Sequence, residues 1–489
     1  MPERLTTLIN NEPVPAASGA RIDVVEPATG VVYASVPDSD AADIDAAVSA
    51  AKGAFPAWSQ TPPAERSRLI LRLADLIERD LESLARLESI DSGKPIALAR
   101  SVDIPRAAAN FRFFATAILH TESAAHQSNL PGPGGSIHAL NVTLRKPRGV
   151  AGLISPWNLP LYLLTWKIAP AIATGNTAVA KPSEVTPLTA CRLGELAVEA
   201  GFPPGVLNIV HGRGAGAGAP LVSHPDVPTV SFTGGTETGR AIAHAGADTF
   251  KRISLELGGK NPNLVFADAD MDEAVATGVR AAFTNQGQIC LCGSRLLVER
   301  SIHDEFVDRL VAGAKARRVG DPLEESTEHG ALVSEDHLAK VDAYVRLARE
   351  LGGEIRCGGK RADPPNDRCR QGAFYEPTVI TGLDPACRPQ QEEIFGPVVT
   401  VTPFESEDEA VAIANSTPYG LASMVWTSRL NRAHRVAERL DAAIVWVNCW
   451  MLRDLRTPFG GMKHSGLGRE GGKDALNFFT EPKNVCIKL

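Results

Sequence analysis

Several features that would narrow the class of this protein are scarce in its sequence. Its 489 residues include eight cysteines, too few for the dense disulfide framework of a small secreted protein. Neither sign of charge dominates, because 50 basic residues stand against 57 acidic ones and the net charge is −7. We therefore expect neither nucleic acid nor an anionic membrane as the main partner.

A long hydrophobic run is also missing. The longest uncharged stretch, GVAGLISPWNLPLYLLTW, lies between Arg148 and Lys167 and contains Pro156, Asn158 and Pro160. Prolines and a polar amide make a membrane span a poor interpretation of this stretch. The first residues, MPERLTTLINNEP, have neither the apolar centre of a signal peptide nor an Arg-rich amphipathic pattern. We expect a cytoplasmic protein with reduced thiols.

The chain is too long for one hydrophobic core, so two or three domains are expected. Apolar residues three and four apart predict helices in DAADIDAAVSAAKGAF, ERSRLILRLADLIERDLESLARLES and SVDIPRAAANFRFFATAIL. A loop, NLPGPGGS, and an extended run, IHALNVTLRKPRGV, follow. Between residues 149 and 256, the apolar segments VAGLIS, TAVAK, VLNIV, TVSF and RISLE alternate with helical ones, which predicts a parallel, doubly wound sheet. A second series from NLVFAD to IVWVN predicts another α/β domain, and the chain ends in the extended run NVCIKL.

Two cysteines one residue apart, Cys290 and Cys292, are the only close pair in the sequence. A zinc or iron–sulfur site usually takes four ligands in two short-spaced pairs, so no metal is expected. A disulfide between residues two apart would be strained. Two readings of Cys290 stay open from the residues alone: a buried inert thiol, or a nucleophile behind the turn Asn285–Gln288 whose backbone N–H groups meet an oxyanion. No G-x-S-x-G elbow or G-x-x-x-x-G-K-[ST] phosphate loop offers a rival nucleophile.

Seven short segments, in order along the chain, resemble the NAD(P)-dependent aldehyde dehydrogenases. NQGQIC (285–290) resembles their nucleophile segment, LELGGKN (255–261) their general-base segment and SPWNLP (155–160) their oxyanion-hole segment. KPSE (181–184), FTGGTETG (232–239), EEIFGPV (392–398) and PFGGMKHSGLGREGG (458–472) complete the series. The resemblance implies an α/β fold with a Rossmann-type NAD-binding domain (1–126 and 147–257), an α/β catalytic domain (258–460) and a small β oligomerisation arm (127–146 and 473–489).

The same resemblance implies roles for three residues. Cys290 would attack the aldehyde to give a thiohemiacetal, and loss of hydride to the nicotinamide would leave a thioester. The side-chain amide of Asn158 and the backbone N–H of Cys290 would hold the oxyanion, and Glu256 would activate water for hydrolysis. Taken without the family pattern, Asn158 is a turn residue and Glu256 a charge at the end of a strand.

The cofactor expected is NAD. The Gly-rich run HGRGAGAGAP (211–220) fits a dinucleotide or a plain turn before a helix. Glu184, together with Lys181, follows the strand TAVAK, where a carboxylate can bond the ribose 2′-OH and repel the 2′-phosphate of NADP; a surface ion pair is the alternative. By resemblance, Glu393 and Phe395 would contact the nicotinamide ribose and ring. Gly235 stands where many relatives have Ser, so backbone N–H groups would replace a hydroxyl at the phosphate. The other cofactor contacts expected are Ile154, Pro156, Trp157, Ser183, Gly214, Phe232, Gly234 and Leu257.

The substrate expected is an anionic semialdehyde. The contexts DIPR, ICLCGSR and LRDLRTPFGG are similar to the branch that acts on 2-hydroxymuconate and 2-aminomuconate semialdehydes in aromatic catabolism. Such substrates carry a carboxylate, which Arg106 and Arg453 could bind in bidentate fashion; Arg456 is a weaker candidate, and solvated arginines are the alternative. Tyr162, Trp166, Leu291 and Phe459 are candidate pocket walls, although core packing explains each equally well.

Other functions stay open at this point. The fold could serve another aldehyde, such as 5-carboxymethyl-2-hydroxymuconate semialdehyde or betaine aldehyde, use coenzyme A as acyl acceptor, or act as a scaffold without catalysis. The extended runs would leave unpaired sheet edges on a lone subunit, and the resemblance implies a homodimer or homotetramer. A hairpin that covers its own domain is the alternative.

Overall fold

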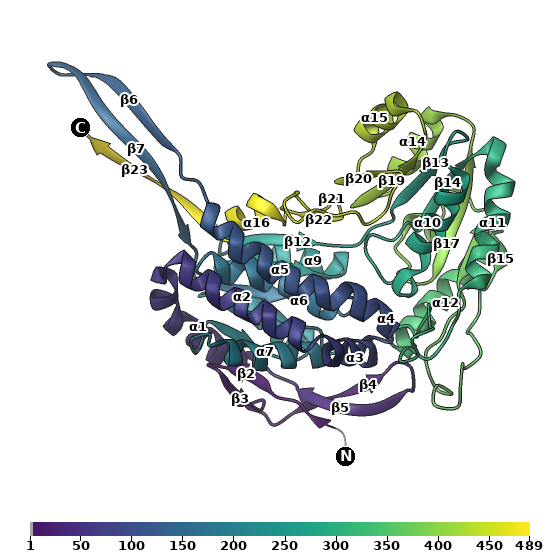
Figure 1. Cartoon of the computed structure of the whole chain (residues 1–489), viewed down its shortest axis with the longest axis horizontal. Helices are drawn as coiled ribbons and strands as arrows, with labels where there is room; N and C mark the ends of the chain where they lie inside the picture. Colours follow the sequence, from purple (N-terminus) through teal and green to yellow (C-terminus); the bar gives the residue numbers. More distant parts are fainter. Residues whose placement is uncertain (1–2) are drawn as a thin grey trace.

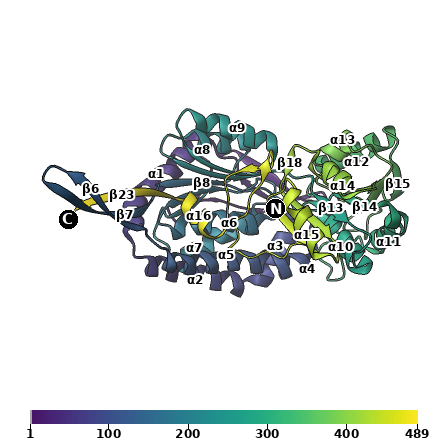
Figure 2. The same cartoon turned by 90° about the horizontal axis from the view of Figure 1, so that it is seen from above.

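The computed structural model describes residues 3–489. Figure 1 shows two lobes side by side and a thin arm that projects from the larger lobe, and Figure 2 shows the same arrangement from above. The confirmed fold class is α/β with mixed sheets. Among residues 3–489, no helix combines the length and the apolar character that a membrane crossing needs.

The larger lobe is built on an eight-stranded sheet. Its strand order is β22-β12-β11-β8-β9-β10-β2-β3, and the neighbours from β12 to β10 run parallel. This order confirms the predicted doubly wound sheet. The strands are β2 (Thr7–Ile9), β3 (Glu12–Val14), β8 (Val150–Ile154), β9 (Thr177–Lys181), β10 (Leu207–Ile209), β11 (Thr229–Thr233), β12 (Arg252–Glu256) and β22 (Gly466–Leu467).

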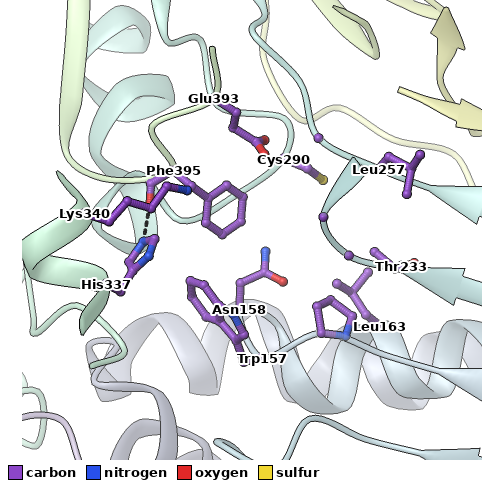
Figure 3. Close-up of a pocket in the computed structure, with 14 residues that line it drawn as sticks. Trp157, Asn158, Leu163, Thr233, Leu257, Cys290, His337, Lys340, Glu393 and Phe395 are labelled. Atoms are coloured by element: carbon purple, nitrogen blue, oxygen red, sulfur yellow. Dashed lines mark hydrogen bonds between the residues drawn. The ribbon is translucent and has the colours of Figure 1, made fainter. Parts of the chain in front are cut away.

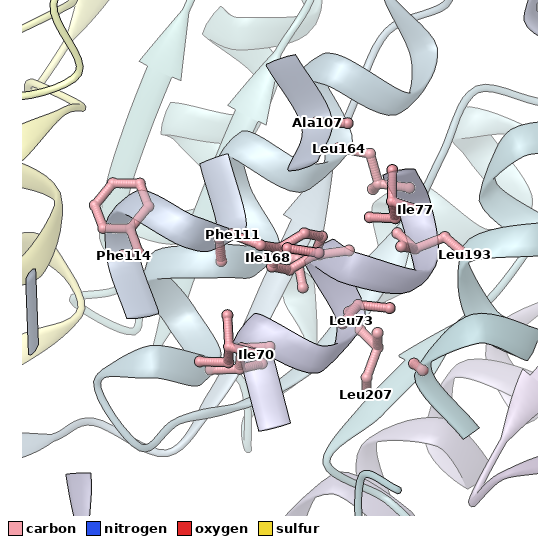
Figure 4. Close-up of a cluster of buried hydrophobic side chains, with 14 of the residues drawn as sticks. Ile70, Leu73, Ile77, Ala107, Phe111, Phe114, Leu164, Ile168, Leu193 and Leu207 are labelled. Atoms are coloured by element: carbon pink, nitrogen blue, oxygen red, sulfur yellow. The ribbon is translucent and has the colours of Figure 1, made fainter. Parts of the chain in front are cut away.

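Helices cover the sheet because each carries an apolar stripe. Figure 4 shows α2, α5 and α6 meeting through Ile70, Leu73, Phe111, Leu164 and Ile168, which are all fully buried. The helices of this lobe are α1 (Ala41–Gln60), α2 (Pro63–Arg79), α3 (Leu81–Ser92), α4 (Ile96–Leu98), α5 (Ile104–Ala117), α6 (Pro160–Ala173), α7 (Leu188–Ala200), α8 (Ala219–Ser223), α9 (Thr236–Ala247) and α16 (Gly472–Phe478).

The second predicted helix is in fact two helices. The chain turns at Asp80, where α2 ends and α3 begins. The Asp80 carboxylate accepts hydrogen bonds from Arg79 and from Arg192 on α7. These bonds lie outside the helical pattern, so periodicity alone could not have located the break.

The smaller lobe holds a seven-stranded sheet in the order β15-β16-β17-β14-β13-β19-β20. All its neighbours are parallel except β15 and β16. Its strands are β13 (Pro262–Val265), β14 (Arg295–Glu299), β15 (Glu354–Cys357), β16 (Thr378–Thr381), β17 (Val398–Phe404), β19 (Ala422–Trp426) and β20 (Ile444–Val447). Its helices are α10 (Met271–Phe283), α11 (His303–Ala316), α12 (Glu335–Glu350), α13 (Arg388–Gln391), α14 (Glu407–Asn415) and α15 (Leu430–Arg439).

Two small sheets complete the lobes. One joins β1 (Glu3–Arg4), β5 (Val31–Pro37) and β4 (Arg21–Glu26), and the other pairs β18 (Tyr419–Gly420) with β21 (Met462–Lys463). Residues 466–467 return to the first sheet as β22, beside the end of β12. The predicted domain limits stay a prediction, and they assigned residues 461–472 to no domain.

The arm is a three-stranded antiparallel sheet in the order β23-β7-β6. Its strands are β6 (Ala125–Gly132), β7 (Gly135–Pro147) and β23 (Thr480–Lys488). The expected loop NLPGPGGS is wrong for residues 129–132, because they pair with residues 135–138 and leave a tight turn at 133–134. The expected unpaired edge of IHALNVTLRKP is also wrong, since β7 is paired on both sides.

Candidate active site

A cavity of about 250 Å³ lies between the two lobes. Figure 3 shows Asn158 and Trp157 on one side of it and Cys290, Glu393 and Phe395 on the other. The full lining is Pro156, Trp157, Asn158, Leu163, Thr233, Gly234, Gly235, Leu257, Gly258, Cys290, His337, Lys340, Glu393 and Phe395. The structure therefore brings two of the three predicted catalytic residues to one space.

A strained turn presents Cys290 to this cavity. After α10 ends, Asn285, Gln286 and Gly287 have φ values of 51°, 54° and 71°, a left-handed run that is costly for residues with a Cβ. A Cβ at Gly287 would lie 2.0 Å from the carbonyl oxygen of Gly396, so the turn has room for glycine alone. The strain concentrates where the nucleophile is expected.

The side chain of Gln286 connects this turn to two other segments of the chain. Its Nε2 donates to the carbonyl oxygens of Gly93 at 2.9 Å and Ala331 at 2.8 Å. Asn261 holds the far side, since its Nδ2 donates to the carbonyl oxygens of Cys290 at 2.7 Å and Cys292 at 2.8 Å. No role was predicted for either amide, because each binds a segment far from it in the sequence.

Asn158 is bound to the same turn. Its Nδ2 donates to the carbonyl oxygen of Gln288 at 2.9 Å, and its own carbonyl oxygen accepts from Asn285 Nδ2 at 3.0 Å. An amide has two N–H donors, so one stays free to face a ligand. The backbone N–H of Cys290 also donates to no backbone acceptor in residues 3–489. These two donors are the pair that an oxyanion site needs.

The surroundings of Cys290 disfavour the thiolate form. Burial raises its pKa well above the ordinary value, the Glu393 and Glu256 carboxylates raise it further, and the Arg453 guanidinium opposes them in part. Cys292, two residues on, is 5% exposed within the core of the smaller lobe, where burial raises the pKa of its thiol to about 12. All eight cysteines are unpaired, and no cluster of metal-ligating side chains occurs among residues 3–489.

Glu256 lies at the end of β12 and is 4% exposed. It is not among the side chains that line the cavity around Cys290. Neither of its carboxyl oxygens has a hydrogen-bond partner in the described chain. Burial raises the pKa of this carboxyl well above its ordinary value, and the Glu470 carboxylate raises it further, while Lys167 opposes them. Lys167 Nζ donates to Glu470 Oε1 at 2.9 Å, a buried pair that was not predicted.

A second cavity of about 740 Å³ shares Pro156, Trp157 and residues 233–235 with the first. Ten of the residues expected to contact the cofactor line it: Ile154, Pro156, Trp157, Lys181, Ser183, Glu184, Gly214, Phe232, Gly234 and Gly235. The other three, Leu257, Glu393 and Phe395, line the first cavity. The two cavities thus gather all thirteen into one cleft along the carboxyl ends of the strands, where open α/β sheets bind ligands.

The chemistry of this cleft fits a dinucleotide. Glu184 and Lys181 are joined at 3.2 Å just past β9, where a carboxylate can accept from a ribose hydroxyl. Helix α9 begins after Gly235 with no side-chain cap, and a Cβ at Gly235 would meet open space. Its first N–H groups are therefore available to an anionic phosphate.

Aromatic rings from both lobes pack together in the wall of the first cavity. Phe395 has a φ of 60°, and its ring packs edge-on against Trp157 at 5.3 Å. His337 packs against Trp157 at 5.1 Å and donates from Nε2 to the Phe395 carbonyl oxygen at 2.7 Å. Burial lowers the pKa of His337 to about 4, so the ring is neutral. His337 and Lys340 were not expected, since α12 reads as an ordinary amphipathic helix.

The predicted anion-binding residues Arg106 and Arg453 come together around Tyr162 and Trp166 and are not among the side chains that line the cavity around Cys290. The Arg106 guanidinium lies over the rings of Tyr162 at 5.1 Å and Trp166 at 5.4 Å. Arg453 lies over Phe459 at 3.9 Å, and its Nη1 donates to the Tyr162 hydroxyl at 3.0 Å. The described chain supplies no carboxylate partner within 4 Å of either guanidinium, and Arg106 Nη2 is buried without a hydrogen-bond partner.

Two other expected residues behave differently. Leu291 is 2% exposed and packs in the core of the smaller lobe, where its carbonyl oxygen accepts from Trp450 Nε1 at 2.9 Å; it lines neither cavity of the cleft. Arg456 is exposed and paired with Asp454 at 2.6 Å. Arg456 therefore already has a carboxylate partner, which the other two arginines lack.

Comparisons with known proteins agree with this geometry. The model of the "Aldehyde dehydrogenase family" matches residues 14–485. A 2-aminomuconic semialdehyde dehydrogenase of Danio rerio is 54% identical over 96% of this chain and 95% of its own length. A 2-hydroxymuconic semialdehyde dehydrogenase of Pseudomonas sp. (strain CF600) is 48% identical over 98% of this chain and 99% of its own. The crystal structure of PnpE in complex with nicotinamide adenine dinucleotide superposes with a TM-score of 0.94 at 46% identity, covering 99% of this chain and 97% of that one.

Proposed function

This chain belongs to the aldehyde dehydrogenase family, and we propose that it oxidises a semialdehyde of muconic type, which carries a carboxylate, to the corresponding acid. NAD is its cofactor. The 2-hydroxymuconic and 2-aminomuconic semialdehyde dehydrogenases that it resembles at 48% and 54% identity support this substrate class.

The observation that carries the substrate proposal is the pair of guanidinium groups without a counterion. Arg453 acts on Arg106 as a like charge, and two such charges side by side in a largely buried site are unfavourable unless an anion joins them. A carboxylate that accepts from both arginines relieves the repulsion and satisfies the unpartnered Arg106 Nη2. Arg453 also acts electrostatically on the Cys290 thiol, which supports binding of the aldehyde end of the same molecule near Cys290.

We assign the catalytic roles to the donors around the cavity and to the buried Glu256 carboxyl, which acts electrostatically on the Cys290 thiol. The Cys290 thiol gives its proton to water, and its sulfur then bonds to the aldehyde carbon while the carbonyl electron pair moves to oxygen and a thiohemiacetal forms. The free N–H of Asn158 and the backbone N–H of Cys290 hold that oxyanion. Bound NAD supplies the hydride acceptor, and the carbon is left as a thioester of Cys290. Glu256 then takes a proton from water, whose oxygen attacks the thioester and releases the acid and the thiol.

Different residues of the cleft suit different parts of NAD. Glu184 and Lys181 suit the adenosine ribose, and the start of α9 suits the pyrophosphate. Glu393, which accepts from the Gly259 N–H at 2.9 Å, and Phe395 suit the nicotinamide half. A coenzyme A acceptor is the less favoured alternative, because a buried carboxyl with both oxygens free serves hydrolysis.

We further propose a cytoplasmic homo-oligomer. The outer edges of β6 and β23 are unpaired within residues 3–489, as is the outer edge of β20 in the smaller lobe. Unpaired strand edges on a projecting arm invite pairing with a second copy. Eight unpaired thiols suit a reducing compartment.

The substrate proposal is tested by steady-state NADH formation with 2-hydroxymuconic semialdehyde and with benzaldehyde. We expect kcat/KM to favour the anionic semialdehyde, and Arg106→Met to raise its KM by about 10- to 100-fold, the loss of one charge-assisted contact. The change for benzaldehyde should be small. An unchanged KM for the anionic semialdehyde in Arg106→Met would remove the guanidinium pair from substrate binding.

A further inference from the structure

We propose that Asn110 is the positioning residue that aims the Arg106 guanidinium at the substrate carboxylate. Asn110 lies one turn after Arg106 on α5 and is 0% exposed. Arg106 Nε donates to Asn110 Oδ1 at 3.0 Å. The inference rests on the proposed function and deepens it, because it concerns how the anion site is set before substrate arrives.

The contacts of Asn110 with α6 fix which way its amide faces. Asn110 Nδ2 donates to the carbonyl oxygen of Tyr162 at 3.1 Å and to Thr165 Oγ1 at 3.1 Å. A carbonyl oxygen accepts and never donates, so the NH₂ group must face α6. The Thr165 hydroxyl donates its own proton to the Tyr162 carbonyl at 3.0 Å, and it therefore meets Asn110 as an acceptor. The amide oxygen is left to face Arg106.

This arrangement determines which donors of Arg106 stay free. A guanidinium is planar and rigid, so an anchored Nε fixes the direction of both terminal nitrogens. The plane also rests between the rings of Tyr162 and Trp166. Arg106 Nη2 is left buried and unpartnered, which costs free energy until a ligand accepts from it. The polar atoms of Asn110 are already used, so the residue acts on substrate through Arg106.

The chemistry of an amide explains why asparagine suits this position. A carboxylate at residue 110 would pair with Arg106 and compete with the substrate for its charge. It would also place an acceptor against the Tyr162 carbonyl oxygen, where a donor now lies. An apolar side chain at residue 110 would leave the Arg106 Nε without an acceptor, and the guanidinium could then rotate. A neutral acceptor orients the guanidinium and leaves its charge for the ligand.

The test compares specificity ratios in the full-length enzyme with NAD. The readout is kcat/KM for 2-hydroxymuconic semialdehyde divided by kcat/KM for benzaldehyde. We expect Asn110→Asp and Asn110→Leu each to lower this ratio by at least about tenfold, mainly through KM for the anionic substrate. A role in packing alone would lower both activities together and leave the ratio where it was, which would overturn the inference.

Combination with Arg106→Met separates this inference from the proposed function. If Asn110 acts through Arg106, adding Asn110→Asp to Arg106→Met lowers the ratio no further. A full additional loss in the double variant overturns the inference. An Arg106→Met enzyme with unchanged KM for the anionic substrate overturns the proposed function instead. Should neither Asn110 variant fold, as judged by thermal unfolding, Thr165→Val removes one of the two acceptors of Nδ2 and should lower the ratio by about twofold or more; an unchanged ratio counts against the inference.

Discussion

At the scale of single residues, Glu256 shows how a carboxyl group is prepared as a base. It is buried, both oxygens are free of hydrogen bonds within the described chain, and burial together with Glu470 raises its pKa. A group with a raised pKa is protonated over a wider range of pH, and its base form grows as the pH rises through that value. The rate of thioester hydrolysis should therefore fall at low pH, where this carboxyl is protonated. This fall is the acid limb of the pH–rate profile.

Replacing Glu256 by Gln isolates that step. The variant still forms the thioester, so rapid mixing with NAD and substrate should show a burst of NADH close to one per active site. Steady turnover should then fall by at least about 100-fold, the usual contribution of a general base, and the acid limb should disappear. Full steady turnover without a burst would show that another group activates the water.

Glu470→Gln is the matched change at a neighbouring residue. It removes a carboxylate that raises the pKa of Glu256 and frees the Lys167 ammonium, and both effects favour the ionised form. The acid limb of turnover should move to lower pH. A shift to higher pH would contradict the electrostatic account of this site.

The individual site residues differ in how far the sequence could locate them. Cys290, Asn158 and the cofactor residues belong to motifs, and the structure gathers them in one cleft; their roles stay predictions. Asn110, His337 and Trp450 belong to no motif. Each makes a hydrogen bond to a segment brought close by the fold: Asn110 to the Tyr162 carbonyl oxygen, His337 to the Phe395 carbonyl oxygen and Trp450 to the Leu291 carbonyl oxygen. Contacts between distant segments leave no local pattern to read.

At the scale of elements, the turn after α10 has no room for one additional carbon atom. Gly287 has a positive φ, and a Cβ there would overlap the Gly396 carbonyl. Gly287→Ala should therefore lower the free energy of unfolding by at least about 2 kcal/mol. It should also lower kcat, because relief of the clash moves the turn that carries Cys290.

Chemical denaturation and NADH formation measure the two effects, and Gly235→Ala is the control for stability alone, because Gly235 lies in the cofactor cleft. The Gly235 Cβ would meet open space and its φ is −71°, so the control should unfold like the parent. Equal stability of the Gly287→Ala and Gly235→Ala enzymes would contradict the steric account.

Elements with strong periodicity were the most predictable part of the chain. The parallel strands from β8 to β12 and the helices α1, α5, α10 and α11 follow directly from apolar spacing. The break at Asp80 and the extension of β6 into NLPG were missed, because the first depends on Arg192 and the second on pairing with β7. Partners supplied by other elements override local preference.

At the scale of the whole molecule, the arm carries the prediction of assembly. The Leu489 N–H donates to the His138 carbonyl at 2.9 Å, and hydrogen-bonded positions alternate along an antiparallel pair. The N–H groups of Asn484, Cys486 and Lys488 therefore point away from β7, toward the free edge. Pro482 lies in the same alternating set, where the lack of an N–H costs no bond to β7.

Cys486→Pro should prevent pairing at the outer edge of β23 and leave the three-stranded arm intact. It removes an outward N–H, so pairing with a second copy weakens while the bonds from β23 to β7 persist. Analytical ultracentrifugation should show smaller species than the parent at equal concentration. Cys486→Ser keeps the N–H and should sediment like the parent; identical sedimentation of the proline variant would place the subunit contact elsewhere.

The hydrogen bonds of Gln286 have a consequence for how the enzyme folds during translation. Its amide joins the turn of the nucleophile to Gly93 and to Ala331, segments on either side of it in the order of synthesis. A nascent polypeptide that has not yet emerged from the ribosome beyond Ala331 lacks one of these two anchors. Translation must therefore pass two thirds of the message before the oxyanion site can take its final shape, and an abandoned fragment cannot carry a working one.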